Sequence, residues 1–309
     1  MPTSSGTIAV AGRYRLDALR GQGSSATVYA ATDLRLNRPV TVKLFDPGVA
    51  ADPSLRARFR RQTAKASRLA HPHVAEILDA GFATEPGDGE RPFVVTEPAG
   101  RWSLRELLDR EGRIPPRQAV KLAHQLASAL SYAHRQGTIH ADVKPENVLV
   151  DDGGEQAKLV DFSLSFVSAK TGATTRETIA RRAAYLAPEQ VRGEPVGPTT
   201  DVYGLGVLLY EMLAGRPPFV AATPEATAER RVLEHARPVG AFDPSIPAGV
   251  EAVIARALER APERRWPTVE QLDAELSRFD TSQLEPVDLG SLPQPTSAVP
   301  TSPRPAGRR

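Results

Sequence analysis

The chain has 309 residues, of which 40% are hydrophobic and 25% are charged, the proportions of an ordinary globular protein. Its formal net charge is only +2, so no overall basic field favours nucleic acid as a partner. It contains no cysteine, which excludes disulfides, thiolate catalysis and cysteine-ligated zinc and agrees with a reducing compartment.

We expect no targeting signal at the beginning of the chain. Residues 1–11 are small and polar, without a positive segment followed by an apolar core, so we expect a disordered lead-in and no signal peptide. The apolar stretch 202–214 is interrupted by glycine and glutamate and is shorter than the roughly 18–20 residues that cross a bilayer. We therefore expect a cytoplasmic protein that does not bind a membrane.

Short β-rich runs with turns between them fill residues 14–45. Polar and apolar positions alternate along 40–45, which places Thr41 and Lys43 on one face of a strand. Another strand signal follows at 93–96. These runs predict a small sheet.

A helix is predicted between these strand signals. Asp52 followed by Pro53 is typical of a helix start, with an N-cap and a proline at the first helical position. One helical stripe follows, at Leu55, Phe59, Gln62, Ala66 and Leu69. Gln62 is therefore expected to face inward.

The second part of the chain has a helical pattern. Residues 116–136 are rich in alanine and leucine with helical spacing, and Gly137 supplies a stop. The segment 202–214 is apolar nearly all round, which indicates a buried central helix. In residues 281–309 about one residue in five is proline, so we expect a disordered tail that buries too little surface to fold.

A predicted hairpin brings two oxygen-bearing side chains together. Its strands are 148–150 and 157–160, so Asn147 and Asp161 become neighbours at its open end. An amide and a carboxylate oxygen suit a hard cation such as Mg²⁺, which also binds phosphates.

Two further polar residues, Asp142 and Lys144, lie in the tight loop just before Asn147. The loop thus combines a candidate base, a cation for a migrating phosphoryl group and a metal ligand. Each residue alone is compatible with an ordinary surface loop, whereas the whole set before such a hairpin predicts a site of phosphoryl transfer.

The motifs resemble those of the Hanks-type Ser/Thr protein kinases of bacteria, over roughly residues 12–279. His140–Asn147, read as H-A-D-V-K-P-E-N, resembles the catalytic loop of that family, and Asp161-Phe162-Ser163 its D-F-G motif. Ala187-Pro188-Glu189 matches A-P-E, and the segment 21–26 resembles the glycine-rich loop over the nucleotide.

The resemblance implies an α+β, bilobal protein-kinase fold over residues 12–280. The N-lobe, residues 12–99, is expected to be small and β-rich with one helix, and the C-lobe, residues 100–280, larger and mainly helical. Lysine at position 144 is the form found in Ser/Thr kinases.

The resemblance also implies individual roles. Asp142 accepts the proton of the substrate hydroxyl, Lys144 neutralises the transferred phosphoryl group, and Asn147 with Asp161 holds Mg²⁺ or Mn²⁺. The implied ATP-binding positions are Gly21, Gly23, Val28, Thr41, Lys43, Thr96, Glu97, Ala99 and Leu149.

Within that set, Lys43 is expected to hold the α- and β-phosphates, and Thr96 occupies the gatekeeper position. The carbonyl of Glu97 and the amide of Ala99 are expected to face adenine.

Two implied contacts are structural. Asp201 is expected to brace the backbone of the catalytic loop, and Glu189 to form a salt bridge with Arg265.

Several positions depart from the family pattern. Gln62 stands where a glutamate pairs with Lys43; its amide oxygen accepts a hydrogen bond but brings no charge. Ala141 replaces an arginine that receives a phosphorylated activation loop, so switching through Thr171, Thr174, Thr175 or Thr178 is disfavoured.

Other departures touch the nucleotide and substrate sides. Ser163 follows Asp161-Phe162 in place of glycine, which limits backbone freedom. Arg182 replaces a threonine whose hydroxyl bridges the catalytic aspartate and lysine, and it either fills the substrate groove, pairs with Asp142 or is solvated. Ala26, Thr41 and Gly100 are expected to weaken nucleotide affinity modestly.

Two interpretations remain. The first is an ATP- and Mg²⁺-dependent Ser/Thr protein kinase of low activity, because the residues of phosphoryl transfer are present. The second is a pseudokinase, a nucleotide-binding or phosphopeptide-recruiting scaffold, suggested by Gln62, Ser163 and Arg182. The expected partner is a protein substrate or a regulated protein, with a homodimer through the N-lobe as one possibility; a small-molecule phosphotransferase is disfavoured.

Overall fold

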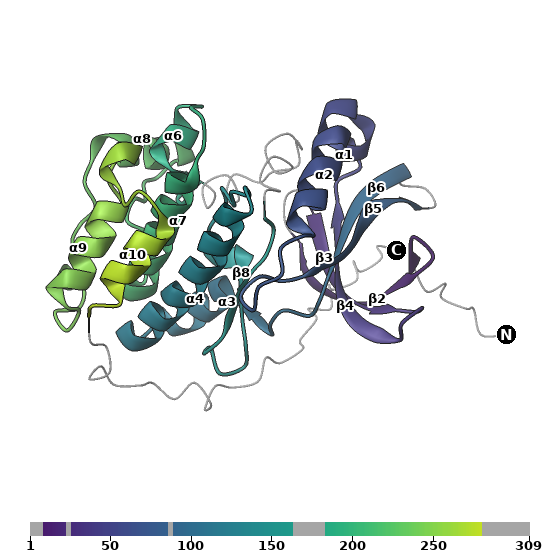
Figure 1. The fold of residues 1–309 in the computed structure, drawn as a ribbon, viewed down its shortest axis with the longest axis horizontal. Coiled ribbons are helices and arrows are strands. Elements are labelled where there is room, and N and C mark those ends of the chain that lie inside the picture. The colour runs from purple at the N-terminus through teal and green to yellow at the C-terminus, as the bar shows by residue number, and fades with distance from the viewer. Residues whose placement is uncertain (1–8, 23–25, 86–88, 163–182, 280–309) are drawn as a thin grey trace, which may run out of the picture.

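The computed structural model describes residues 9–22, 26–85, 89–162 and 183–279, which form two lobes (Figure 1). The N-lobe contains a six-stranded antiparallel sheet with the order β1-β2-β3-β4-β6-β5. Its strands are β1 (Ala9–Val10), β2 (Tyr14–Gln22), β3 (Ala26–Asp33), β4 (Arg38–Phe45), β5 (Ile77–Glu85) and β6 (Gly89–Thr96). The α+β, bilobal prediction is confirmed.

The first strand lies where the sequence predicted a disordered lead-in. Ala9 and Val10 pair with β2, and Val10 is buried in the core of the sheet. Burial of this one apolar side chain, together with two ladder pairs, orders a segment whose composition alone indicated no structure. The predicted tail lies outside the described residues.

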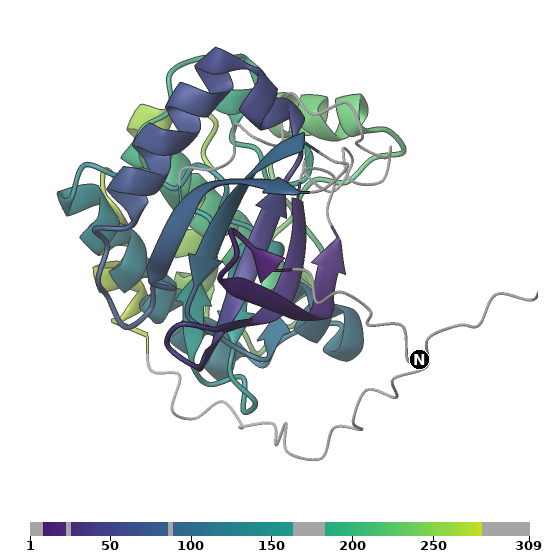
Figure 2. The same ribbon diagram turned by 90° about the vertical axis from the view of Figure 1, so that its right-hand side faces the viewer.

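Two helices pack on the sheet, where one was expected: α1 (Gly48–Ala51) and α2 (Pro53–Ala66) (Figure 2). The predicted cap of α2 is present, because the Asp52 carboxylate accepts hydrogen bonds from the backbone N–H groups of Ser54 at 2.8 Å and Leu55 at 3.1 Å. Phe59 of α2 packs edge-on against Phe45 of β4, with ring centroids 5.5 Å apart. This contact joins the helix to the strand that carries Lys43.

The buried stripe of α2 differs from the prediction at one position. Leu55, Phe59, Thr63 and Ala66 are buried, whereas Gln62 is only half-buried. Thr63 tolerates burial because its hydroxyl donates to the carbonyl of Phe59 at 2.9 Å. A helical step of 100° per residue therefore leaves Gln62 at the flank of the buried face.

The C-lobe is mainly helical, as predicted. Its α-helices are α3 (Leu104–Glu111), α4 (Pro116–Arg135), α6 (Pro188–Val191), α7 (Pro198–Ala214), α8 (Pro224–Leu233), α9 (Ala248–Ala257) and α10 (Val269–Leu276). The described part of this lobe also contains the short 3₁₀ turns η1 (Pro145–Asn147), η3 (Val239–Ala241) and η4 (Pro262–Arg264). The described part of the chain contains no helix long and apolar enough to span a membrane.

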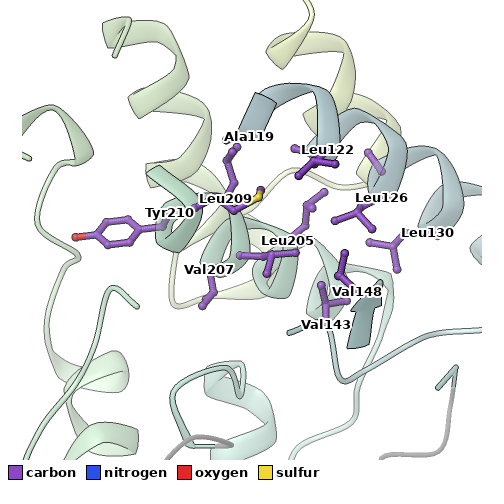
Figure 3. Packing of buried hydrophobic residues seen from close by; sticks show 14 of the residues in the cluster. Ala119, Leu122, Leu126, Leu130, Val143, Val148, Leu205, Val207, Leu209 and Tyr210 are labelled. Atoms are coloured by element: carbon purple, nitrogen blue, oxygen red, sulfur yellow. The ribbon is translucent and has the colours of Figure 1, made fainter. Parts of the chain in front are cut away.

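Helix α7 is the centre of the C-lobe core. Its residues from Thr200 to Leu213 are all buried, and Leu205 and Leu209 lie against Leu122 and Leu126 of α4 (Figure 3). Gly204 allows the loop that carries Asp142 to approach, since an added Cβ would lie 2.9 Å from the Cβ of Val143.

A small three-stranded sheet joins the lobes. It consists of β7 (Trp102–Ser103), β8 (Val148–Val150) and β9 (Ala157–Leu159), and β8 with β9 forms the predicted hairpin. The segment after α2 runs beside β9: Ala75 N–H donates to Leu159 at 3.0 Å, and Leu159 N–H donates to His73 at 2.9 Å. The hairpin therefore holds the segment that follows α2.

Candidate active site

The open end of the hairpin places Asn147 and Asp161 together. Val148 pairs with Leu159, and the N–H of Val160 donates to the carbonyl of Asn147 at 3.0 Å, so the ladder closes one residue before Asp161. The side-chain amide nitrogen of Asn147 donates to the backbone carbonyl of Asp142 at 2.8 Å. The amide oxygen of Asn147 has no hydrogen-bond partner among the residues that the structure describes, so it can serve as a ligand.

Asp142 is held by two donors within its own loop. Its Oδ2 accepts a hydrogen bond from Lys144 Nζ at 2.6 Å and one from Asn147 Nδ2 at 3.1 Å. Both donors lie within two to five residues of Asp142, so the loop itself orients the carboxylate. The side chain of Asp142 is 10% exposed, so solvent and ligands still reach it.

The backbone of this loop is held from below by Asp201, as expected. The Asp201 carboxylate accepts from the N–H groups of His140 at 2.9 Å and Ala141 at 2.7 Å, and it lies 2.7 Å from Nε2 of His134. Ala141 has a φ of +60°, a left-handed conformation that is strained for a residue with a Cβ. The two charge-assisted hydrogen bonds offset that strain.

Lys43 and Asp161 form an ion pair between the lobes. Burial alone would raise the pKa of Asp161, but the ammonium of Lys43 outweighs it and holds the pKa of Asp161 below its usual range. The next residue, Phe162, is buried and packs against the ring of His140, with centroids 4.6 Å apart. A small cavity beside this pair is lined by Ala66, Val74, Ala75, Ile77, Val94, Thr96, Val160, Asp161 and Phe162.

One face of the N-lobe sheet carries four of the predicted nucleotide-binding residues. In the register of β3, β4 and β6, Val28 lies opposite Lys43, and Thr41 lies opposite Thr96. All four side chains are only half-buried, while Val42 on the other face is fully buried. This face is therefore open to a ligand between the lobes.

The segment after β6 offers the backbone groups predicted to face adenine. Glu97 uses its N–H for a hydrogen bond to Glu76 at 3.1 Å, whereas its carbonyl and the N–H of Ala99 have no hydrogen-bond partner among the described residues. Leu149 of β8 is half-buried beside this segment. Gly100 has a packing role, because an added Cβ would lie 2.7 Å from the carbonyl oxygen of Val150.

Gln62 makes no hydrogen bond to Lys43 within the described residues. The ammonium of Lys43 lies on Asp161, and no side-chain hydrogen bond of Gln62 occurs within the described residues. Helix α2 therefore supplies no charged partner to the lysine.

Glu189 and Arg265 form the expected salt bridge at the base of the C-lobe. Arg265 donates Nη1 to Oε1 at 2.8 Å and Nη2 to Oε2 at 2.7 Å. The hydroxyl of Thr200 donates to the same carboxylate at 2.8 Å. Burial would raise the pKa of Glu189, but these donors hold it below its usual range.

Some predicted positions lie outside the described residues. These are Gly23, Ser163, Arg182 and the four activation-loop threonines Thr171, Thr174, Thr175 and Thr178. Gly21, at the end of β2, is exposed, and an added Cβ there would meet nothing within 4 Å.

Sequence reasoning missed several contacts around the loop. The side-chain amide of Gln190 donates to the carbonyl of Ala141 at 2.9 Å, which ties α6 to the catalytic loop. Glu211 accepts hydrogen bonds from Tyr185 and Arg105. The presence of a glutamate in the apolar run of α7 was a signal that could have identified this site.

Among the described residues no group of three histidine, cysteine or acidic side chains could hold a metal ion. The Asp161 carboxylate and the free amide oxygen of Asn147 are nevertheless hard oxygen donors, the kind that Mg²⁺ prefers when it also binds phosphate. These donors fit a phosphate-bound cation and do not form a complete site of their own.

Known proteins resemble this chain in sequence and in fold. The model of the family described as "Protein kinase domain" matches residues 14–276. Serine/threonine-protein kinase PknB of Mycolicibacterium smegmatis is 37% identical over 273 residues, which cover 88% of this chain and 43% of PknB. A probable serine/threonine-protein kinase of Streptomyces coelicolor is 37% identical over 267 residues, covering 86% of this chain and 39% of that protein.

Solved structures resemble the whole described fold. A double mutant of the Mycobacterium tuberculosis PknI kinase domain has a TM-score of 0.70 and 25% sequence identity, and the match covers 89% of this chain and 98% of that one. The chain spans less than half the length of the curated relatives that it matches.

Proposed function

This chain belongs to the protein kinase family, and from that premise we propose that it transfers the γ-phosphate of ATP to serine and threonine hydroxyls of proteins. The observation that carries the proposal is the arrangement of Asp142, Lys144 and Asn147 in one hydrogen-bonded loop, with Lys43 on Asp161. Phosphoryl transfer depends mainly on positioning and on neutralising charge, and these groups supply both.

In the proposed reaction the substrate hydroxyl oxygen forms a bond to the γ-phosphorus while the bond to the ADP oxygen breaks. Asp142 takes the hydroxyl proton. Lys144, which donates a hydrogen bond to Asp142 in the structure, neutralises the negative charge of the transferred phosphoryl group. Lys43 holds the α- and β-phosphates, and the free carbonyl of Glu97 and N–H of Ala99 receive adenine. Protein kinases use a divalent metal; Asn147 and Asp161 would hold Mg²⁺ or Mn²⁺, which neutralises phosphate charge when bound.

The proposed partners are protein substrates or a regulated protein, and the proposed location is the cytoplasm, where ATP is available. Three leucines of the N-lobe are exposed, Leu19, Leu34 and Leu36. They provide apolar surface that a homodimer through the N-lobe would bury.

The proposal is tested by label transfer. Purified protein with γ-labelled ATP, Mg²⁺ and a generic basic protein is expected to transfer label, and Lys43→Met is expected to lower transfer at least about a hundredfold because phosphate positioning is lost. Chelation of the metal should have a similar effect. Transfer by the wild type that does not exceed that of Lys43→Met would contradict a kinase activity.

A second candidate is a pseudokinase that binds nucleotide without turnover. It is favoured by one observation: among the described residues, half-buried Gln62 makes no hydrogen bond to Lys43. In that case ATP should still raise the melting temperature of the wild type, and Lys43→Met should abolish the shift.

Gln62→Glu is expected to raise turnover about fivefold, because a carboxylate at position 62 would attract the ammonium of Lys43, which Gln62 does not bond, and free Asp161 for the metal. The measurement is kcat at saturating ATP. Ala64→Glu, which adds the same charge at an exposed position of α2, should leave kcat unchanged. Equal turnover of Gln62→Glu and the wild type would show that the missing charge does not limit the reaction.

A further inference from the structure

Helix α7 is apolar along most of its length, yet it buries a second carboxylate, Glu211, besides Asp201. Glu211 is 2% exposed, and its two oxygens accept hydrogen bonds from different elements. Arg105 of α3 donates Nη2 to Oε1, and the hydroxyl of Tyr185 donates to Oε2. Tyr185 lies two residues before Ala187, where the backbone enters α6.

The same guanidinium reaches the catalytic loop. Nε of Arg105 lies 3.9 Å from Oε1 of Glu146, the residue before Asn147, and Nη1 lies 3.3 Å from Oδ1 of Asp109. Arg105 Nε and Glu146 Oε2 are buried without a hydrogen-bond partner in the part of the chain that the structure describes. One cation thus bridges α3, the catalytic loop, α7 and the segment before α6, while its contact with the catalytic loop is incomplete.

The carboxylates of this cluster outnumber its cation. Glu211, Glu146 and Asp109 share Arg105, and among the described residues the Tyr185 hydroxyl is the remaining titratable neighbour of Glu211. Burial raises the pKa of Glu211 to about 7; Arg105 and the hydrogen bond from Tyr185 oppose this, and the charges of Glu146 and Asp109 reinforce it. Glu211 is therefore protonated below neutral pH and ionised above it.

We infer that Arg105 is a positioning residue: together with ionised Glu211 it fixes Tyr185, and hence the segment leading into α6, against the loop that carries Asp142. The inference rests on the proposed function, because that segment is where a substrate must lie to bring its hydroxyl to Asp142. A second bond links the same two parts, from Gln190 of α6 to the carbonyl of Ala141 at 2.9 Å.

Protonation of Glu211 removes the charge that attracts Arg105. The guanidinium then keeps only Glu146 and Asp109 as charged partners, and the Tyr185 hydroxyl loses its anionic acceptor. Turnover of a peptide substrate is therefore expected to rise with pH through about 7, in step with ionisation of Glu211.

Kinetics test this with three variants. Arg105→Gln is expected to lower kcat/KM for a peptide about tenfold and to leave the KM for ATP within about twofold, since the lost hydrogen bonds are charge-assisted and lie away from the nucleotide. Glu211→Gln should remove the ionisation near pH 7 from the profile, whereas the titration of ATP itself would remain. Arg110→Gln, which removes an exposed cation from the same helix, should match the wild type. The inference would be overturned if Arg105→Gln and Arg110→Gln had equal kcat/KM for the peptide. It would also be overturned if the pH profile of Glu211→Gln matched that of the wild type.

Hydrogen exchange tests the coupling without any turnover. Peptides covering residues 183–191, corrected for the intrinsic pH dependence of exchange, are expected to be better protected at pH 8 than at pH 6.5 in the wild type and equally protected at both in Arg105→Gln. In Tyr185→Phe, which removes one hydroxyl and keeps the ring, the protection of these peptides should also no longer depend on pH. This variant replaces Arg105→Gln in the test if Arg105→Gln does not fold. A wild type that transfers no label would contradict the proposed function alone, and pH-independent protection would contradict the inference alone.

Discussion

Replacing Asp142 by asparagine is expected to lower the rate of phosphoryl transfer by about a hundredfold to ten-thousandfold, the usual contribution of a general base. An amide accepts no proton from the substrate hydroxyl, and it gives Lys144 a neutral partner where the structure has a carboxylate at 2.6 Å. The amide oxygen still accepts the hydrogen bond from Asn147, so the loop should keep its conformation.

Two measurements separate catalysis from binding in this variant. Label transfer should fall, while the rise in melting temperature on adding ATP and Mg²⁺ should stay within about 1 °C of the wild-type shift, because the nucleotide contacts are untouched. Asp152→Asn, at a carboxylate that is 73% exposed in the turn between β8 and β9, should transfer label like the wild type. Undiminished transfer by Asp142→Asn would remove Asp142 from the reaction.

Replacing Arg265 by methionine is expected to lower the free energy of unfolding by about 3–5 kcal/mol. The guanidinium and Glu189 are 0% and 3% exposed, and they share two hydrogen bonds of 2.7–2.8 Å. Loss of one partner leaves a buried charge that methionine does not satisfy. Since one kcal/mol corresponds to about 2–4 °C in a domain of this size, Tm should fall by at least about 6 °C.

An exposed pair provides the control. Arg192 and Glu194 form an ion pair at 2.7 Å, but their side chains are 36% and 48% exposed, so Arg192→Met should cost less than about 1 kcal/mol. Arg265→Lys keeps the charge but loses the bidentate geometry, so its loss of unfolding free energy should lie between those of Arg265→Met and Arg192→Met. It replaces Arg265→Met in the test if that variant does not fold. Arg265→Met no less stable than Arg192→Met would show that the buried pair contributes little.

The pH dependence of the same pair has a definite sign. The pKa of Glu189 is below its usual range in the folded protein, so its contribution to stability is present above the unfolded pKa and is lost as the pH falls through the folded value. Glu211 has the opposite effect on stability, because its pKa is raised to about 7 in the folded protein. Its contribution to the free energy of unfolding is present below the unfolded pKa and is lost as the pH rises toward 7.

Much of the fold followed from local pattern. The cap at Asp52, the hairpin of β8 and β9 and the buried helix α7 depend on spacing and turn residues, which act over a few positions. The same holds for the proximity of Asn147 and Asp161, which a two-stranded hairpin enforces whatever packs around it.

Other features depend on distant segments, and local pattern did not predict them. Strand β1 forms because Val10 enters the core of the N-lobe. On α2 the packing against the sheet buries Thr63, so Gln62 lies at the flank of the buried face. The partner of Lys43 is Asp161, 118 residues away, and not the residue at position 62.

The sequence by itself determined the family and the residues of the catalytic loop, since these are encoded as motifs with fixed spacing. Only the tertiary structure decided which charged side chains are buried and which groups form hydrogen bonds or ion pairs with them. Arg105 comes from α3, Tyr185 from the segment before α6, and Glu211 from α7. They meet because packing around α7 brings these elements together. Burial then sets their protonation, because the cost of a charge depends on the whole surroundings and not on neighbours in the chain.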